Sequence, residues 1–202
     1  MREGILGGSF DPIHNGHLHV AREAMARLGL DRVLFVPARV PPHKQGVAVT
    51  AAEHRLAMAR LAIAGAPGFE VSDAEIRRDG PSYTFDTVTA ELARLGAGWE
   101  IVFLVGADQA LELGTWHRIG ELLQICAVVP VTRPGFRLDD LGRLARPLGV
   151  ELAAKVKAAS LEIPPADVSS TEIRRRVRAG EDIAALVPRK VAEYIGAHKL
   201  YR

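Results

Sequence analysis

Short apolar runs alternate along this chain with longer segments of helical periodicity. The apolar runs cover residues 5–6, 33–36, 101–105 and 125–131, with a weaker candidate at residues 69–71. They are continuous rather than alternating with polar residues, which is typical of strands that are covered on both faces. The chain is therefore expected to build a sheet that is buried between two layers.

The segments between these runs carry apolar residues at helical spacing. Three such stripes are Leu18, Ala21, Met25 and Leu28, then Phe85, Val88, Leu92 and Leu95, and near the end Val187, Val191, Tyr194 and Ile195. The alternation predicts an α/β fold, a Rossmann-like doubly wound parallel sheet with helices on both faces and a small C-terminal helical extension. Residues 135–150 are interpreted as either a surface helix or a variable connection.

Composition limits the class of protein. The 202 residues are 48% hydrophobic and 25% charged, and the formal charge of +2 gives no reason to expect a nucleic-acid partner. This length favours a single domain over residues 1–202. The one cysteine, Cys126, is expected to pack in the core of a protein from a reduced compartment. No signal peptide and no apolar run of about 20 residues is visible, so no membrane association and a cytoplasmic location are predicted.

Ligands of doubly wound folds bind at the carboxyl ends of the strands, and the first such end is rich in candidates. Gly7 and Gly8 end the first strand and let another molecule approach the backbone. A helix is expected to begin near Asn15, where free N–H groups and the helix dipole attract anions. His14 and His17 then lie on the same side of its first turn. The pair is suited to donating hydrogen bonds to phosphate oxygens.

Other interpretations of this segment are weaker. Either histidine alone is more simply a capping or half-exposed residue. The glycines match neither the P-loop nor the Gly-x-Gly-x-x-Gly pattern. His14 and His17 could ligate a metal, but no cysteine accompanies them, and no metal site on the protein is expected.

The string Gly7-Gly8-Ser9-Phe10-Asp11-Pro12-Ile13-His14-Asn15-Gly16-His17-Leu18 resembles the H-x-G-H nucleotidyltransferase superfamily, and more closely bacterial nicotinate-nucleotide adenylyltransferases. This resemblance implies an enzyme of NAD biosynthesis that transfers AMP from ATP to nicotinate mononucleotide, giving nicotinate adenine dinucleotide and pyrophosphate. It implies catalytic roles for His14, His17 and Arg174. It implies ATP contacts at Gly7, Gly8, Ser9, Phe10, His14, His17, Gly106, Asp108, Ser169, Ser170 and Arg174. Acceptor contacts are implied at Ser9, Lys44, Thr84, Trp116 and His117.

The ends of the later strands supply the rest of these residues. Lys44 follows three prolines and offers a mobile charge for phosphate, although an exposed loop lysine is the simpler reading without the resemblance. Thr84 begins a helix as a cap residue, and the resemblance places it near the nicotinate carboxylate. Trp116 would ordinarily be a core residue, whereas the family uses this tryptophan to cover the pyridine ring beside His117.

Two further segments resemble the adenosine and phosphate sites of the family. Gly106 and Asp108 follow the central strand, where an acidic turn either binds a ribose or simply starts a helix. Ser169 or Ser170 is expected to cap a helix that begins at residue 172 or 173, with Arg174 directed at phosphate. Arg175, Arg176 and Arg178 of this helix are expected to be solvated.

The expected mechanism is in-line attack by the acceptor phosphate on the α-phosphorus of ATP, without a protein nucleophile. Mg²⁺ is expected to arrive bound to ATP, with Asp11 and Asp108 as indirect contacts at most. Three alternatives stay open: a phosphopantetheine or nicotinamide mononucleotide acceptor, an ATP sensor without turnover, and a structural module. The sequence does not decide the oligomeric state, and a homo-oligomer is one possibility.

Overall fold

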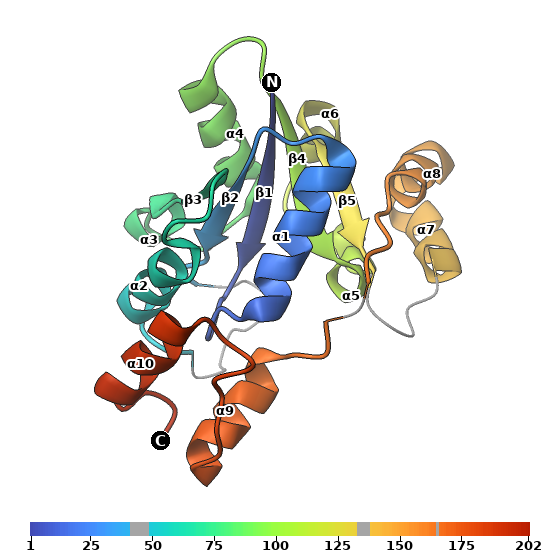
Figure 1. Cartoon of the computed structure of the whole chain (residues 1–202). Coiled ribbons are helices and arrows are strands. Elements are labelled where there is room, and N and C mark those ends of the chain that lie inside the picture. The colour runs from blue at the N-terminus through green and yellow to red at the C-terminus, as the bar shows by residue number, and fades with distance from the viewer. Residues whose placement is uncertain (41–48, 133–137, 165) are drawn as a thin grey trace.

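The computed structural model describes residues 1–40, 49–132, 138–164 and 166–202, and within them five strands form one parallel sheet (Figure 1). The strands are β1 (Arg2–Gly8), β2 (Arg32–Pro37), β3 (Phe69–Val71), β4 (Glu100–Gly106) and β5 (Ala127–Val131). Their order across the sheet is β3-β2-β1-β4-β5. The predicted parallel α/β sheet is confirmed.

This strand order contains a reversal between β1 and β4. The chain runs outward from β1 to β2 and β3, then returns to lay β4 along the other side of β1. In open α/β sheets, ligands bind beside such a reversal at the carboxyl ends of the strands. The segments that follow β1 and β4 are therefore the place to look for a site. Figure 1 shows this end of the sheet beside α9 and α10.

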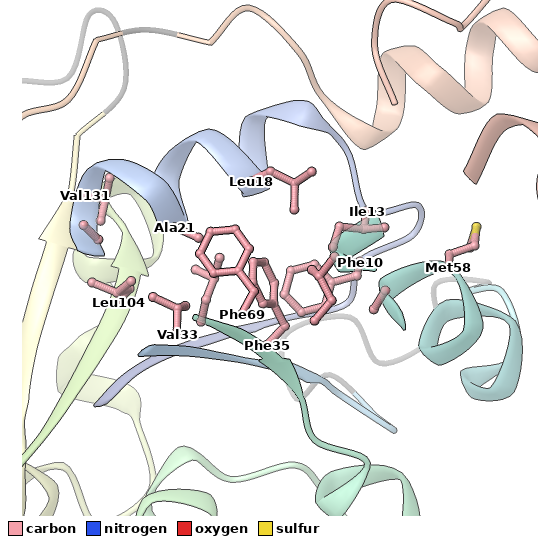
Figure 2. Packing of buried hydrophobic residues seen from close by; sticks show 14 of the residues in the cluster. Phe10, Ile13, Leu18, Ala21, Val33, Phe35, Met58, Phe69, Leu104 and Val131 are labelled. Carbon is pink, nitrogen blue, oxygen red and sulfur yellow. The ribbon is translucent and has the colours of Figure 1, made fainter. Parts of the chain in front are cut away.

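Neighbouring residues of each strand enter opposite layers of the core. In β2, Val33 and Phe35 join the cluster on one face, whereas Leu34 and Val36 join the cluster on the other. Each large apolar side chain buried in this way contributes about 1.5–3 kcal/mol. Figure 2 shows part of the first cluster, where Phe10 and Ile13 pack beside Phe35. Burial on both faces explains why the strand sequences are continuously apolar.

Helices cover both faces of the sheet, as predicted. The first face is covered by α1 (Asn15–Leu28) and α2 (Ala52–Ile63), and α9 (Ser170–Ala179) and α10 (Arg189–Ala197) extend the same core beyond the carboxyl ends of the strands (Figure 1). The second face is covered by α4 (Thr84–Leu95), α6 (Ile119–Ile125) and α8 (Val150–Ala158). The shorter helices are α3 (Ala74–Arg77), α5 (Ala107–Ala110), η2 (Leu113–Thr115), η3 (Leu138–Leu144) and α7 (Ala145–Leu148). The C-terminal extension, α9 and α10, adds Ile173, Val191 and Ile195 to the first cluster.

One predicted boundary was wrong. The fourth apolar run, residues 125–131, is not strand throughout, because Ile125 ends α6 and the strand begins at Ala127. Cys126 caps that helix, and its N–H donates to the Leu122 carbonyl at 3.0 Å. Cys126 is half-buried, and burial raises the pKa of its thiol to about 12.

The segment interpreted as a surface helix or a variable connection anchors itself to the core through two leucines. Its described portion forms η3 and α7, and both Leu141 and Leu144 are buried in the second cluster. These two leucines, three residues apart, face the protein, whereas Gly142, Arg143 and Arg146 are exposed, so the described portion is helical and lies at the surface, as one of the two interpretations had it. Across the described residues, no helix has both the length and the apolar character needed to cross a bilayer.

Candidate active site

The segment between β1 and α1 starts the candidate site. Its Asp11–Pro12 peptide is cis, and Phe10 adopts a positive φ of 47°. The Phe10 side chain is buried in the core (Figure 2) and meets the His17 ring edge-on, with centroids 5.0 Å apart. Phe10 therefore packs against His17 from the side of the core. Because its side chain is buried, a contact between Phe10 and ATP would involve its backbone.

His14 and His17 lie together at the first turn of α1. His14 is the N-cap residue and the helix begins at Asn15, where its start was predicted. The backbone N–H of His14 donates to Nδ1 of His17 at 3.2 Å. The two rings stack with centroids 3.7 Å apart. The structure thus brings the two predicted histidines side by side at a helix N-terminus.

The start of α9 reaches the same segment from the far end of the chain. Ser169 caps the helix by accepting from Glu172 N–H at 3.2 Å, and the helix begins at Ser170, two residues earlier than the first predicted position. The Ser170 hydroxyl donates to the Pro12 carbonyl at 2.9 Å, and Arg174 Nη1 donates to the Asp11 carbonyl at 2.6 Å. Two helix N-termini therefore meet at one turn, which favours bound anions.

A pocket of about 610 Å³ opens beside this meeting point. One wall is the first turns of α1, with His14, Gly16 and His17. The opposite wall is lined by Ile163, Pro164, Ala166, Asp167, Val168, Ser169, Glu172 and Arg176. The pocket combines apolar side chains with charged and hydroxyl groups, a mixture that suits a nucleotide.

Sequence reasoning missed several residues of this larger pocket. Arg176 was expected to be solvated, but it lines the pocket while its Nε donates to Glu172 at 2.8 Å. His19 also lines the pocket, and its Nε2 lies 2.9 Å from the Pro164 carbonyl. The helical spacing of Ser169, Glu172 and Arg176, which places them on one face, could have indicated the shared wall.

A second pocket, of about 230 Å³, lies where β1 and β4 end. It gathers four predicted acceptor residues, Ser9, Thr84, Trp116 and His117. It also contains Gly7 and Gly8, which were predicted to contact ATP. The fifth predicted acceptor residue, Lys44, lies outside the described residues.

Aromatic contacts shape this smaller pocket. Trp116 meets Phe103 edge-on at 5.8 Å, and the Tyr83 and His117 rings stack at 4.3 Å. Trp116 and Thr84 are both half-buried, so each has a surface open to a ligand. A flat ligand would find aromatic faces here.

Glu75 is a pocket residue that nothing in the sequence indicated. Its side chain lies on α3, is buried, and accepts from the Thr87 hydroxyl at 2.6 Å. Burial raises the pKa of this carboxyl, which opposes the hydrogen bonds from Thr87 and Ser82 that lower it. Arg78 in turn donates to Thr87 Oγ1 at 3.1 Å. This polar cluster fixes the start of α4 against the pocket.

Gly106 and Asp108, predicted to contact adenosine, line neither of these two pockets. Gly106 ends β4, and Asp108 is exposed on α5 at the same edge of the sheet. Asp11 is not arranged as a metal ligand, because its two carboxylate oxygens accept from Thr50 N–H and from the Tyr201 hydroxyl. Among the described residues, no three His, Cys, Asp or Glu side chains gather as a metal site would require.

The chain matches a family model described as cytidylyltransferase-like over residues 5–176. A relative from Symbiobacterium thermophilum, named "Probable nicotinate-nucleotide adenylyltransferase", is 48% identical over 99% of this chain and 95% of its own length. A relative from Moorella thermoacetica with the same name is 44% identical over 100% of this chain and 92% of its own length. This chain belongs to the nicotinate-nucleotide adenylyltransferase family. The resemblance seen in residues 7–18 is confirmed, and the chain is a nucleotidyltransferase.

Solved structures of adenylyltransferases share the fold. The nicotinic acid mononucleotide adenylyltransferase of Plasmodium falciparum, complexed with NaAD, has a TM-score of 0.75 and 21% identity, covering 99% of this chain and 97% of that chain. The same Plasmodium enzyme complexed with APC has a TM-score of 0.74. At 21% identity this likeness shows a shared fold, and the description of the pockets rests on the residues of this chain alone.

Proposed function

We propose that this adenylyltransferase transfers the adenylyl group of ATP to nicotinate mononucleotide, giving nicotinate adenine dinucleotide and pyrophosphate. The observation that carries the proposal is the pair of pockets on the two sides of the β1–α1 segment. Gly7, Gly8 and Ser9 border the smaller pocket, and His14 and His17 border the larger one. Two substrates bound there would meet at this segment.

ATP is assigned to the larger pocket. His14 and His17, over the N-terminus of α1, would hold the α-phosphate and the charge that develops on it. Ser169, Ser170 and Arg174, at the start of α9, would hold the departing pyrophosphate. Gly106 and Asp108 stay predicted contacts of adenosine.

Nicotinate mononucleotide is assigned to the smaller pocket. Trp116 would cover the pyridine ring, and the first turn of α4 at Thr84 would receive the ring carboxylate. Ser9, His117 and Lys44 complete the proposed acceptor contacts. A carboxylate at a helix N-terminus is favourable where a neutral amide gains less, which supports the acid as substrate.

The transfer proceeds by in-line displacement. An oxygen of the acceptor phosphate attacks the α-phosphorus of ATP, a new P–O bond forms, and the bond to the β-phosphate oxygen breaks as pyrophosphate leaves. The attacking oxygen is already anionic, so the protein needs neither a nucleophile nor a general base. Its contribution is to align the two phosphates and to stabilise charge in the transition state.

Mg²⁺ is proposed to arrive on ATP, where it would neutralise phosphate charge. No residue of this chain is assigned to it as a direct ligand. We also propose that residues 1–202 act as one nucleotidyltransferase domain in the cytoplasm, and a homo-oligomer stays open. Both core clusters lie against the same sheet, which supports a single folding unit.

The proposal is tested by measuring pyrophosphate release from ATP and Mg²⁺ with three acceptors, nicotinate mononucleotide, nicotinamide mononucleotide and phosphopantetheine. Nicotinate mononucleotide is expected to give the highest kcat/KM. A higher value with either other acceptor would refute the assignment of the smaller pocket. ATP binding by calorimetry without product from any acceptor would instead indicate a nucleotide sensor.

A further inference from the structure

The turn that precedes His14 is held by side chains from distant parts of the chain. Asp11 lies at its centre and is buried, with 5% of its surface exposed. Its Oδ2 accepts from Thr50 N–H at 3.3 Å, and its Oδ1 accepts from the Tyr201 hydroxyl at 2.7 Å. The Asp11 carbonyl accepts from Arg174 as well. Asp11 therefore joins the candidate catalytic segment to the turn after α10.

Arg55 secures the other side of the same turn. It lies on α2 with 1% of its surface exposed, and it donates to the carbonyls of Ser9 and Thr50, each at 2.7 Å. Burial lowers the pKa of Arg55, and the charge of Asp11 opposes that shift. A buried guanidinium beside a buried carboxylate is stable only when both are hydrogen-bonded. The Tyr201 hydroxyl supplies one of the two partners of Asp11.

Tyr201 reaches Asp11 by an unusual backbone path. Lys199 and Tyr201 have positive φ values of 51° and 64°, a conformation that costs energy for residues other than glycine. Burial and the neighbouring Asp11 charge both raise the pKa of Tyr201, so its hydroxyl keeps its proton at neutral pH. The two unfavourable φ values bring the Tyr201 hydroxyl to the buried Asp11 carboxylate, and the resulting hydrogen bond fixes the position of that carboxylate.

We propose that Tyr201 is a positioning residue for adenylyl transfer, which holds Asp11 and through it the turn that sets His14 and His17. The inference rests on the proposed function of this site. Displacement of reacting groups by about 1 Å can cost about 100-fold in rate. A hydrogen bond to a charged group contributes enough to change a rate by roughly 10-fold or more. The hydroxyl of Tyr201 should therefore affect kcat more than the binding of either substrate.

The test compares Tyr201→Phe with Tyr194→Phe. The first variant removes the Tyr201 hydroxyl, which donates to Asp11. The second removes the Tyr194 hydroxyl on α10, which lies 2.9 Å from Nδ1 of His54. Tyr201→Phe is expected to lower kcat about 10-fold while both KM values change less than about twofold. Tyr194→Phe is expected to keep kcat within about twofold of the wild type. An unchanged kcat in Tyr201→Phe would overturn the proposal.

A double-mutant cycle with Asp11→Ala tests the route of the effect. If Tyr201 acts through Asp11, adding Tyr201→Phe to Asp11→Ala should change kcat by less than about twofold. If the losses of kcat in the two single variants multiply in the double variant, the Tyr201 hydroxyl acts independently of Asp11 and the proposal is rejected.

Hydrogen–deuterium exchange of residues 9–17 separates this inference from the proposed function. Faster exchange in Tyr201→Phe but not in Tyr194→Phe supports positioning, and equal exchange in the two variants contradicts it, whichever acceptor the enzyme uses. A wild-type protein without activity on nicotinate mononucleotide would count against the proposed function alone.

Discussion

The hydrogen bond between His14 N–H and His17 Nδ1 determines what His17 can do. Because Nδ1 accepts this bond, the proton of the neutral ring is carried by Nε2. Phe10 packs against the ring and limits its rotation. His17 is thereby prepared to donate a hydrogen bond from Nε2 rather than to remove a proton. This favours a role in stabilising phosphate charge.

The residue-scale prediction concerns His17→Ala. Removing one donor to transition-state charge costs about 100- to 1,000-fold in kcat. We expect that loss in steady-state pyrophosphate release, from a variant that still melts cooperatively by circular dichroism. A folded variant with nearly wild-type turnover would contradict the mechanism.

The packing of α1 against the segment that leads into α9 depends on a glycine. A Cβ atom at Gly16 would lie 2.9 Å from Val168 Cγ1 and 3.1 Å from His14 Nδ1. Both neighbours line the larger pocket. Any side chain at position 16 would therefore push the two walls apart or turn the His14 ring.

Gly16→Ala and Gly120→Ala form a matched pair for testing this packing. Both glycines are helical, but a Cβ at Gly120 meets nothing within 4 Å. Alanine favours a helix by about 1 kcal/mol over glycine, so Gly120→Ala should raise Tm by about 2–4 °C with unchanged activity. Gly16→Ala should show no such gain and should lower kcat/KM for ATP about 10-fold or more. Equal behaviour of the two variants in melting and in activity would argue against a constraint at Gly16.

Sequence periodicity was sufficient to predict the helices and strands, but it was insufficient to predict many residues of the site. The parallel sheet and the His14–His17 pair follow from local patterns, namely apolar runs, helical spacing and a Gly-Gly strand end. Glu75 and Tyr201 could not be found in this way, because their roles arise from contacts with residues 12 and 190 positions away. Local patterns show which face of an element is buried, but not which distant polar groups meet there.

At the scale of the whole molecule, the end of the sheet opposite the site contains a buried acid. Glu3, at the start of β1, has no exposed surface and is bonded to Arg32, with Arg94 3.6 Å away. Burial, and then the neighbouring Glu91 carboxyl, raise the pKa of Glu3 from 4.5 to about 7, against the opposing effect of Arg32. The folded protein therefore keeps a proton that the unfolded chain releases between these two pH values.

Stability should consequently fall as pH rises from about 4.5 to 7, by up to about 3 kcal/mol on account of Glu3. Glu3→Gln, which cannot ionise, should make Tm less dependent on pH between pH 5 and pH 8. Glu121→Gln is the control, because Glu121 is exposed and its Arg118 partner lowers its pKa. Differential scanning calorimetry at several pH values measures the slope, and an unaltered slope in Glu3→Gln would rule out this origin.

Among the residues that the structure describes, the two pockets share no lining residue. The smaller one is built from the ends of β1 and β4 and the segments around α3, α4 and η2. The larger one is built mainly from α1 and from residues 163–164 and 166–176. Substitutions among the lining residues of one pocket therefore leave the lining residues of the other unchanged. The scaffold is therefore modular, and under the proposed assignment of the pockets a protein engineer could retarget the acceptor by redesigning the smaller pocket while conserving the larger one.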